Sequence, residues 1–193
     1  MNKLIFATSN QNKILEISKE LNNFSLLSLH DIGYHHDIIE DGLTLKENAL
    51  IKCRVIHEQY NIPCISDDTG LEVRALQGRP GVLSARYAGE AANSDLNIQK
   101  LLFNMQNVID RRACFRTVIC FKFKTYELFF EGTVDGVISS IKRGDAGFGY
   151  DPIFIPNGYE KTFAQLPLLE KNKISHRGQA VKKLKNYLDS FNF

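Results

Sequence analysis

The sequence predicts an α/β fold with a mixed, elongated central β-sheet flanked by helices. Segments with helical spacing of apolar residues lie at both ends of the chain, and long β-branched and aromatic segments lie between them. Hydrophobic residues make up 44% of the 193 residues, which suffices for a sizeable core. We therefore expect one domain over residues 1–193, organised as two lobes that share one sheet.

The first third of the chain predicts two strands and two helices. Lys3–Thr8 has the apolar run of a short buried strand, and Asn12–Leu21 has the apolar face of a helix. A second helix begins at Thr44, because Thr44 and Glu47 have the spacing of a capping box. The next strand runs through the apolar residues 62–65 into Asp67 and Asp68.

The rest of the chain predicts further helices and a strand pair. Ser94–Met105 reads as a helix. Cys114–Val134 predicts two long antiparallel strands, although the turn near Thr125 lacks Gly or Pro. A last helix is expected over Ser175–Asn192, with a buried apolar stripe that ends at Phe191.

Charge and the first residues exclude two classes of partner. The 24 Lys and Arg nearly balance the 22 Asp and Glu, so no basic excess indicates binding to a nucleic-acid polymer. The apolar run at the start, Leu4–Ala7, is too short for a signal peptide or a membrane-spanning helix. We therefore expect a cytoplasmic protein with no membrane partner.

The cysteines and paired histidines point to ordinary structural roles rather than to a metal site. The four cysteines form no Cys-x-x-Cys pair, so we expect small, buried, reduced side chains: Cys53, Cys64, Cys114 and Cys120. His35 and His36 are adjacent and would point in different directions, which favours solvated histidines over a zinc site.

One turn is a candidate anion site. The stretch ATSNQNK, Ala7–Lys13, takes the chain from a buried strand into a helix, where backbone N–H groups and the helix dipole attract anions. Ser9 and Asn10 add hydrogen bonds, and Lys13 is a cation that is unfavourable in a first turn unless an anion binds it. A simple helix N-cap explains the turn equally well.

Two pairs of acidic residues predict a Mg²⁺ site. Glu40 and Asp41 precede Gly42, while Asp67 and Asp68 end a strand; carboxylates from two segments near a phosphate are how proteins hold Mg²⁺. In isolation Glu40 and Asp41 also fit a solvated turn. Since neighbours on a strand point to opposite faces, one of Asp67 and Asp68 should meet the metal. The other should accept a hydrogen bond or neutralise a lysine.

Two further stretches add groups suited to a purine. Gly144–Phe154 contains three glycines, and Phe148 could lay its ring over a flat ligand, although an ordinary glycine loop fits as well. Lys171, His176 and Arg177 make the segment 170–180 locally basic, with the last two at a helix start. Taken together, the motifs indicate a purine nucleotide with several phosphates and Mg²⁺.

With these motifs, the chain resembles the inosine triphosphate pyrophosphatase family. The resemblance covers nearly the whole chain, in family order, through ATSNQNK, EDGLTLKENALIKCR, SDDTGLEVRALQGRPGVLSARYAG, GFGYDPIF and SHRGQA. It implies two lobes with the active site in the cleft between them, and a homodimer. It also implies Mg²⁺-dependent hydrolysis of inosine, deoxyinosine and xanthosine triphosphates to the monophosphate and pyrophosphate, which keeps these bases out of DNA and RNA.

The resemblance assigns roles motif by motif. Glu40 and Asp68 match metal ligands, and Asp68 also matches the proton acceptor. The residues that match substrate contacts are Thr8, Ser9, Asn10, Gln11, Asn12 and Lys13 on the phosphate side, Thr69, then Phe148, Gly149, Tyr150 and Asp151 on the base and sugar side, and Lys171, His176 and Arg177 around the purine.

This sequence departs from the family pattern at three positions: Thr69 stands where serine is usual, Asp41 replaces a common threonine and Leu45 a usual phenylalanine. The extra acid leaves open whether Glu40 or Asp41 binds the metal.

The expected mechanism is in-line attack of water on the α-phosphorus, with Asp68 taking the proton. Arg177 is expected to donate to the 6-oxo group that separates hypoxanthine and xanthine from adenine. One alternative is an aspartyl-phosphate phosphatase, but its acids stand two apart, whereas Asp67 and Asp68 are adjacent. The other is a non-catalytic purine nucleotide sensor, which would keep the binding loops and lose the base.

Overall fold

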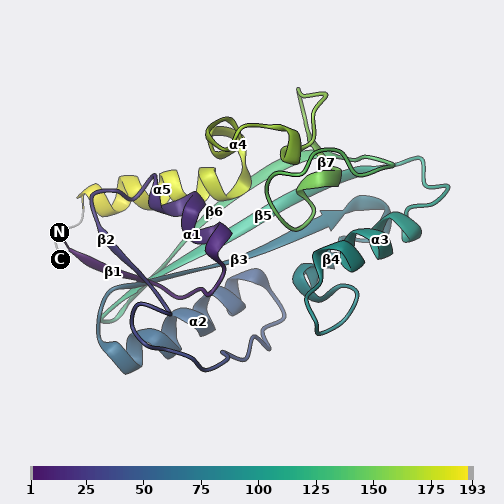
Figure 1. Cartoon of the computed structure of the whole chain (residues 1–193). Helices are drawn as coiled ribbons and strands as arrows, with labels where there is room; N and C mark the ends of the chain where they lie inside the picture. The colour runs from purple at the N-terminus through teal and green to yellow at the C-terminus, as the bar shows by residue number, and fades with distance from the viewer. Residues whose placement is uncertain (1, 191–193) are drawn as a thin grey trace. The chain divides into compact units, whose positions relative to one another are not determined.

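The structure is a computed structural model that describes residues 2–190, and it confirms the α/β fold with a mixed sheet (Figure 1). The strand order within these residues is β2-β1-β3-β5-β6-β7, and β4 pairs with β3. The strands are β1 (Lys3–Phe6), β2 (Ser25–Ser28), β3 (Cys64–Val73), β4 (Pro80–Gly81), β5 (Arg112–Phe123), β6 (Tyr126–Ile138) and β7 (Phe154–Pro156).

Strand direction makes the sheet mixed. β1 runs parallel to β2 and to β3, whereas β4 pairs antiparallel with β3 and β7 antiparallel with β6. β5 and β6 are neighbours joined by two residues only, which requires an antiparallel hairpin. Lys124 takes a positive φ of 52° in that turn, and so supplies the conformation that glycine usually provides.

The helices begin and end close to the predicted residues, except for one short helix, Leu168–Ile174, that was not predicted. They are α1 (Gln11–Ser18), α2 (Leu45–Tyr60), α3 (Ser94–Asn104), α4 (Leu168–Ile174) and α5 (His176–Ser190), with the 3₁₀ turns η1 (Arg74–Leu76), η2 (Ser84–Arg86), η3 (Asp151–Ile153) and η4 (Phe163–Gln165). The capping box of Thr44 and Glu47 is present at the start of α2, as predicted. The predicted end of the last helix at Asn192, and the stripe position Phe191, lie outside the described residues.

The chain forms two compact units. Unit 1 comprises the described residues up to 68, 117–132 and 177–190, and unit 2 comprises 69–116 and 133–176. Each has its own core and is described separately. The prediction of one domain, with an active-site cleft between two lobes, stays a prediction.

Unit 1 has apolar side chains on both faces of its strands. Leu4 and Phe6 pack with α1 and α5 on one face, through residues that include Ile17 and Leu184. The intervening Ile5 packs with Ala49 of α2 on the other face. This alternation along β1 explains why the strand reads as a continuous apolar run, and Figure 1 shows α2 across β1 from α1 and α5.

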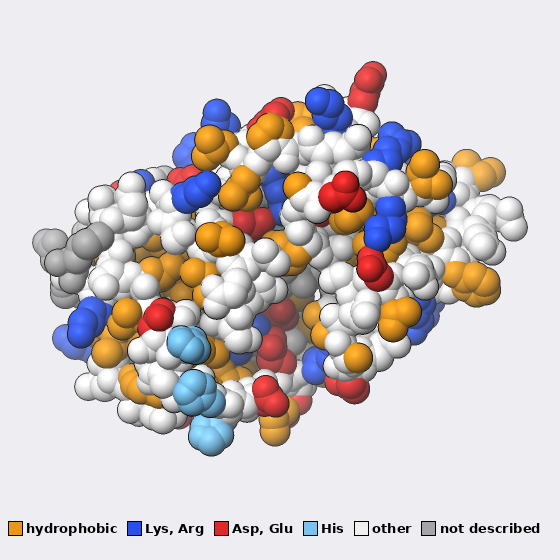
Figure 2. Space-filling view, viewed as in Figure 1, with side chains coloured by type: hydrophobic (Ala, Val, Ile, Leu, Met, Phe, Trp, Pro, Cys, Tyr) orange, Lys and Arg blue, Asp and Glu red, His pale blue; other side chains and the backbone are white. Residues whose placement is uncertain are grey.

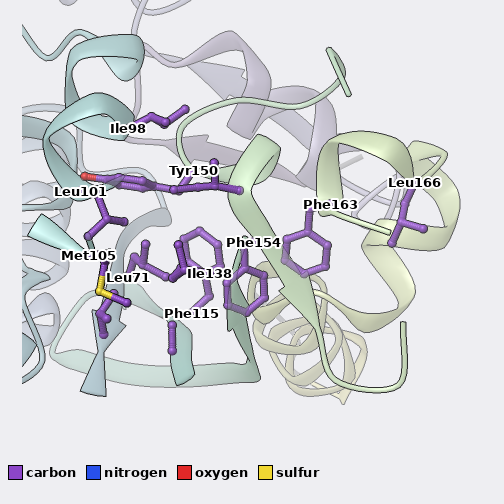
Figure 3. Close-up of a cluster of buried hydrophobic side chains, with 13 residues drawn as sticks. Leu71, Ile98, Leu101, Met105, Phe115, Ile138, Tyr150, Phe154, Phe163 and Leu166 are labelled. Atoms are coloured by element: carbon purple, nitrogen blue, oxygen red, sulfur yellow. The ribbon is translucent and has the colours of Figure 1, made fainter. Parts of the chain in front are cut away.

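Unit 2 is built around an aromatic cluster (Figure 3). Phe115 lies 4.7 Å from Phe154 between ring centroids, and Phe163 lies 5.2 Å from Phe154. Ile98 and Leu101 bring α3 onto the same cluster. These buried rings support the loops of unit 2 that the sequence marks as substrate contacts.

The cysteines are free thiols, and the paired histidines are exposed on the surface. Cys53, Cys64 and Cys120 are free and buried as predicted, but Cys114 is half-buried because its strand position is only partly covered. Figure 2 shows imidazole side chains gathered on the surface, and the exposed histidines include His35 and His36. Among residues 2–190, no helix is both long and apolar enough to span a membrane.

Candidate functional site

The turn between β1 and α1 is held by its own side chains. Asn10 is the N-cap of α1, and its Oδ1 accepts from the backbone N–H of Asn12 at 3.0 Å and of Lys13 at 3.3 Å. The N–H of Asn10 in turn donates to Thr8 Oγ1 at 3.2 Å. The N-cap interpretation is thus confirmed, while Ser9, Gln11 and Asn12 are placed on the same turn and its phosphate-binding role stays a prediction.

A buried ion-pair network lies next to this turn in unit 1. Lys13 Nζ donates to Asp67 Oδ1 at 2.9 Å, and Arg177 Nε donates to Asp67 Oδ2 at 3.0 Å. Arg177 Nη1 also contacts Glu16 Oε2 at 2.5 Å. The Asp67 side chain has no exposed surface and that of Arg177 is 3% exposed. Asp67 is therefore the residue that neutralises a lysine, which was one of the two roles expected for the adjacent acids.

The electrostatics of this network favour the ionised forms. Burial alone would raise the pKa of Asp67, but Lys13 and Arg177 outweigh it and hold that pKa well below its usual range. Burial opposes the charge of Arg177, yet Asp67 and Glu16 raise its pKa above the ordinary value. Both groups remain charged inside the protein because each compensates the other.

The contacts of Asp68 include two side chains of α2, Asn48 and Lys52, and Lys52 also reaches Glu40 in the loop before that helix. Lys52 Nζ lies 2.5 Å from Glu40 Oε2 and 3.9 Å from Asp68 Oδ1, and Asn48 Nδ2 donates to Asp68 Oδ2 at 3.2 Å. Burial raises the pKa of Asp68, and the charge of Glu40 adds to that effect, whereas Lys52 and Lys13 oppose it. A carboxylate in this setting takes up a proton more readily than an exposed one.

Glu40 and Asp68 converge on one cationic position. Both carboxylates contact the same ammonium, that of Lys52, so they face a shared point. Within residues 2–190, no three or more His, Cys, Asp or Glu side chains form a group able to hold a metal. The two acids match the sparse protein ligation of Mg²⁺, in which water and phosphate supply the remaining oxygens. Asp41 is exposed.

The predicted base-side residues of unit 2 form their own arrangement. Asp151 Oδ2 accepts from the backbone N–H of Phe148 at 2.8 Å and from Lys171 Nζ at 2.6 Å. That ammonium lies 5.1 Å from the centroid of the Phe148 ring. A Cβ at Gly147 would overlap the Asp151 carboxylate, so only glycine permits this close approach. The loop is therefore shaped, and the simple glycine-loop interpretation does not account for its ion pair.

Two other predicted residues of unit 2 are part of its packing. Tyr150 is buried, and its hydroxyl donates to the carbonyl of Ser84 at 2.9 Å. His176 is stacked on Phe115, with ring centroids 4.5 Å apart. Gly149 has a positive φ of 59° in the same loop, and Thr69 directly follows Asp68 on β3.

The predicted residues thus fall into two sets. Unit 1 contains the turn 8–13 with Glu40, Asp68 and Arg177, and unit 2 contains the loop 148–151 with Lys171 and His176. The assembly of both sets around one nucleotide stays a prediction. So does the base-contacting role of Arg177, whose guanidinium binds Asp67 and Glu16 in this structure.

Three residues that contact the predicted acids or Arg177 in unit 1 were not predicted from the sequence: Glu16, Asn48 and Lys52. A signal for two of them was present. Asn48 and Lys52 lie in the buried stripe of α2 that also contains Leu45, Ala49 and Cys53. Polar residues inside an apolar stripe need a buried partner, and Asp68 is that partner here.

Comparisons with known proteins give a consistent result. A sequence model of the Ham1 family matches residues 4–187. A Christiangramia forsetii protein named dITP/XTP pyrophosphatase is 50% identical over 187 residues, 96% of this chain and 98% of that protein. The HAM1 protein structure from Coxiella burnetii has a TM-score of 0.91 at 37% identity, covering 99% and 100% of the two chains. The Staphylococcus aureus Ham1 structure has a TM-score of 0.89 at 39% identity, covering 98% and 99%.

Proposed function

This chain belongs to the Ham1 family, and from that membership and the geometry of unit 1 we propose that it hydrolyses non-standard purine nucleoside triphosphates. The substrates are dITP, ITP and XTP, and the products are the nucleoside monophosphate and pyrophosphate. The family resemblance identified from the motifs is confirmed. The reaction cleanses the nucleotide pool, and we assign it to the cytoplasm, where that pool is used.

The observation that carries the proposal is the setting of Asp68. One of its oxygens accepts from Asn48 and the other faces Lys52, so the carboxylate is oriented from both sides. A base held in this way can accept the proton of a water that attacks the α-phosphorus. Lys13, at the first turn of α1, has ammonium donors for the phosphates.

Mg²⁺ is the proposed cofactor, and the residues present fit it. Glu40 and Asp68 provide carboxylate oxygens, the ligand type that Mg²⁺ prefers. In this structure both carboxylates face one cation, the ammonium of Lys52. When bound, the ion would polarise the phosphoryl oxygens and stabilise charge on the leaving pyrophosphate. We therefore expect activity to be lost in excess EDTA and restored by Mg²⁺.

The base is proposed to lie against unit 2. Phe148 offers an aromatic face. The ammonium of Lys171 lies near that ring, and His176 is a second potential donor in unit 2. Donors that match the 6-oxo group of hypoxanthine and xanthine would meet the 6-amino donor of adenine. Sites that read a polar group in this way reject the mismatch by about 10⁴-fold or more.

The test is to identify products. The protein is incubated with Mg²⁺ and dITP, ITP, XTP, GTP or ATP, and nucleotides and phosphates are separated. We expect monophosphate and pyrophosphate from the first three, with a strong preference over GTP and ATP. Inorganic phosphate with the diphosphate would instead indicate phosphatase chemistry, and binding without products would indicate a nucleotide sensor.

A homodimer is part of the same proposal, since the family resemblance implies it. Light scattering after size-exclusion chromatography measures the mass directly. A mass of twice the chain supports the dimer, and a mass of one chain at assay concentration excludes it.

A further inference from the structure

Asn48 connects Asp68 to the loop that contains Glu40. It is 1% exposed on α2, and its side-chain amide makes two hydrogen bonds. The backbone N–H of Gly42 donates to Asn48 Oδ1 at 2.8 Å, and Asn48 Nδ2 donates to Asp68 Oδ2 at 3.2 Å. One buried amide therefore links two segments that carry the acidic side chains of the site.

The two contacts fix the orientation of this amide. A backbone N–H can only donate, so the oxygen of Asn48 must face Gly42. The NH₂ group then faces Asp68, and it can only donate to that carboxylate. A flipped amide would oppose donor to donor and acceptor to acceptor at the two ends.

Lys52 repeats the pattern one helical turn further along α2. Its ammonium contacts Asp68 on β3 and Glu40 in the loop, just as Asn48 contacts Asp68 and Gly42. Positions i and i+4 lie on one face of a helix, so α2 sets the spacing between loop and strand. Packing at the loop is tight, because a Cβ on Gly42 would lie 2.7 Å from Asn48 Oδ1.

We propose that Asn48 is a positioning residue for the reaction: its amide, oriented by Gly42, donates to Asp68 Oδ2 and holds the carboxylate in its working orientation. The inference rests on the proposed function for its kinetic consequence. The contact itself does not depend on that function. The proposal gives Asn48 a role in turnover in addition to its role in packing.

Asn97 is a matched control in unit 2. It is also a buried helical asparagine that clamps a loop, since its Oδ1 accepts from the N–H of Ala88 at 2.6 Å and its Nδ2 donates to Ala85 O at 2.8 Å. It contacts no carboxylate among these partners. Asn97→Asp and Asn97→Ala therefore measure what the same substitutions do to a loop clamp alone.

The decisive variant is Asn48→Asp. Its carboxylate still accepts from Gly42, but it cannot donate and it places a negative charge beside Asp68. We expect kcat for dITP to fall about 10-fold or more with KM changed less than about 3-fold, because an oriented hydrogen bond to a charge is lost. Hydrogen exchange of the Gly42 backbone N–H, measured by NMR, should stay slow in Asn48→Asp and become fast in Asn48→Ala.

The opposite ranking would overturn the proposal. If Asn48 only clamps the loop, Asn48→Asp keeps kcat within about 2-fold of the wild type and Asn48→Ala alone loses activity. Gly42→Ala gives a second test, because the added methyl group would lie 2.7 Å from both Asn48 Oδ1 and Glu47 Cβ, so the Asn48 amide or the loop must move. We expect it to lower kcat, and wild-type kcat in a folded Gly42→Ala protein would contradict the positioning role.

A failure of the proposed function is distinguishable. If the wild type releases no pyrophosphate from dITP, that function fails, and the side-chain amide signals of Asn48 still decide the contact. They should shift in Asp68→Ala, while those of Asn97 stay in place. Unchanged Asn48 signals would overturn the inference without any reference to catalysis.

Discussion

Asp67 and Asp68 are adjacent in sequence, but their side chains make hydrogen bonds on opposite sides of β3. Alternation along β3 points Asp67 towards α1 and α5, where Lys13 and Arg177 compensate it, and Asp68 towards α2. Repulsion between the two acids is offset because each has cations on its own side. Asp67 therefore suits a structural ion pair, and Asp68, whose carboxylate is partly accessible, suits a catalytic role.

Paired substitutions should separate these two roles. Asp68→Asn is expected to lower kcat by at least ~10²-fold, the usual scale for losing a positioned base, with a small change in melting temperature. Asp67→Asn should instead lower the melting temperature, since it leaves Lys13 and Arg177 short of a buried counter-charge. Steady-state kinetics and thermal unfolding of both variants provide the measurement; a near-normal kcat in Asp68→Asn would contradict the assignment.

Arg177 is the residue for which two roles compete. Arg177→Ala leaves two buried carboxylates undercompensated, so we expect the free energy of unfolding to fall by about 3–5 kcal/mol. The exposed Arg54 of the Arg54–Glu127 pair is the control, because Arg54→Ala should cost about 1 kcal/mol or less. Urea unfolding gives both values.

Substrate choice then tests base contact by Arg177. If it reads the purine, the ratio of kcat/KM for ITP to that for ATP narrows in Arg177→Ala. Equal proportional losses on the two nucleotides would leave only the ion-pair role.

At this scale the sequence predicted the acids better than their partners. The alternation of Asp67 and Asp68 follows from strand geometry, which is local. The partners of Asp67 are 54 residues away in Lys13 and 110 residues away in Arg177, and such contacts are set by folding as a whole. Glu16 looks like an ordinary solvated helix residue until Arg177, its partner on α5, is known.

At the scale of elements, the hairpin of β5 and β6 is fastened to α2 by charge. Glu127 on β6 accepts from Arg54 Nη2 at 2.8 Å and from Lys122 Nζ at 3.0 Å. Hydrogen bonds from Arg54 outweigh burial and, with Lys122, hold the pKa of Glu127 at about 2, below its ordinary value of 4.5.

The stability that this carboxylate contributes should depend on pH. Because the folded pKa is depressed, the contribution is complete above about pH 4.5 and is lost as the pH falls towards 2. Glu127→Gln should therefore be less stable than the wild type by about 1 kcal/mol at pH 7, with the difference shrinking below pH 4.5. Urea unfolding at several pH values measures it, and a difference independent of pH would contradict the ion-pair account.

Long elements and the apolar strand β1 were predictable, whereas the other short elements were not. α2 has its capping box and apolar stripe within its own sequence, so its start at Leu45 follows from Thr44 and Glu47. β2, β4 and β7 have four residues or fewer, and α4 has seven. Segments of that length are defined by the strands and helices they contact rather than by their own periodicity.

For the whole molecule, two cores support two sets of candidate residues. Unit 1 contains the acids and the turn 8–13, which is predicted to bind phosphate, and the aromatic core of unit 2 supports the loop around Phe148 and Asp151. The order of motifs along the chain predicted the family, because that order can be read from the sequence without knowing any contacts. It could not predict how the charges within each unit are neutralised, which depends on side-chain geometry.

The charges gathered in unit 1 have a consequence for the protein before it meets any ligand. Lys13, Lys52 and Arg177 face Glu16, Glu40, Asp67 and Asp68, so three positive charges oppose four negative ones. Such a site is nearly neutral by itself, so we expect the protein to stay folded without a bound ion. In the absence of nucleotide, we expect melting temperatures in EDTA and in Mg²⁺ to agree within about 2 °C, as for an ion that binds the free protein weakly. A large fall in EDTA would show that the empty site is under electrostatic strain, and would make the ion a structural component from the start.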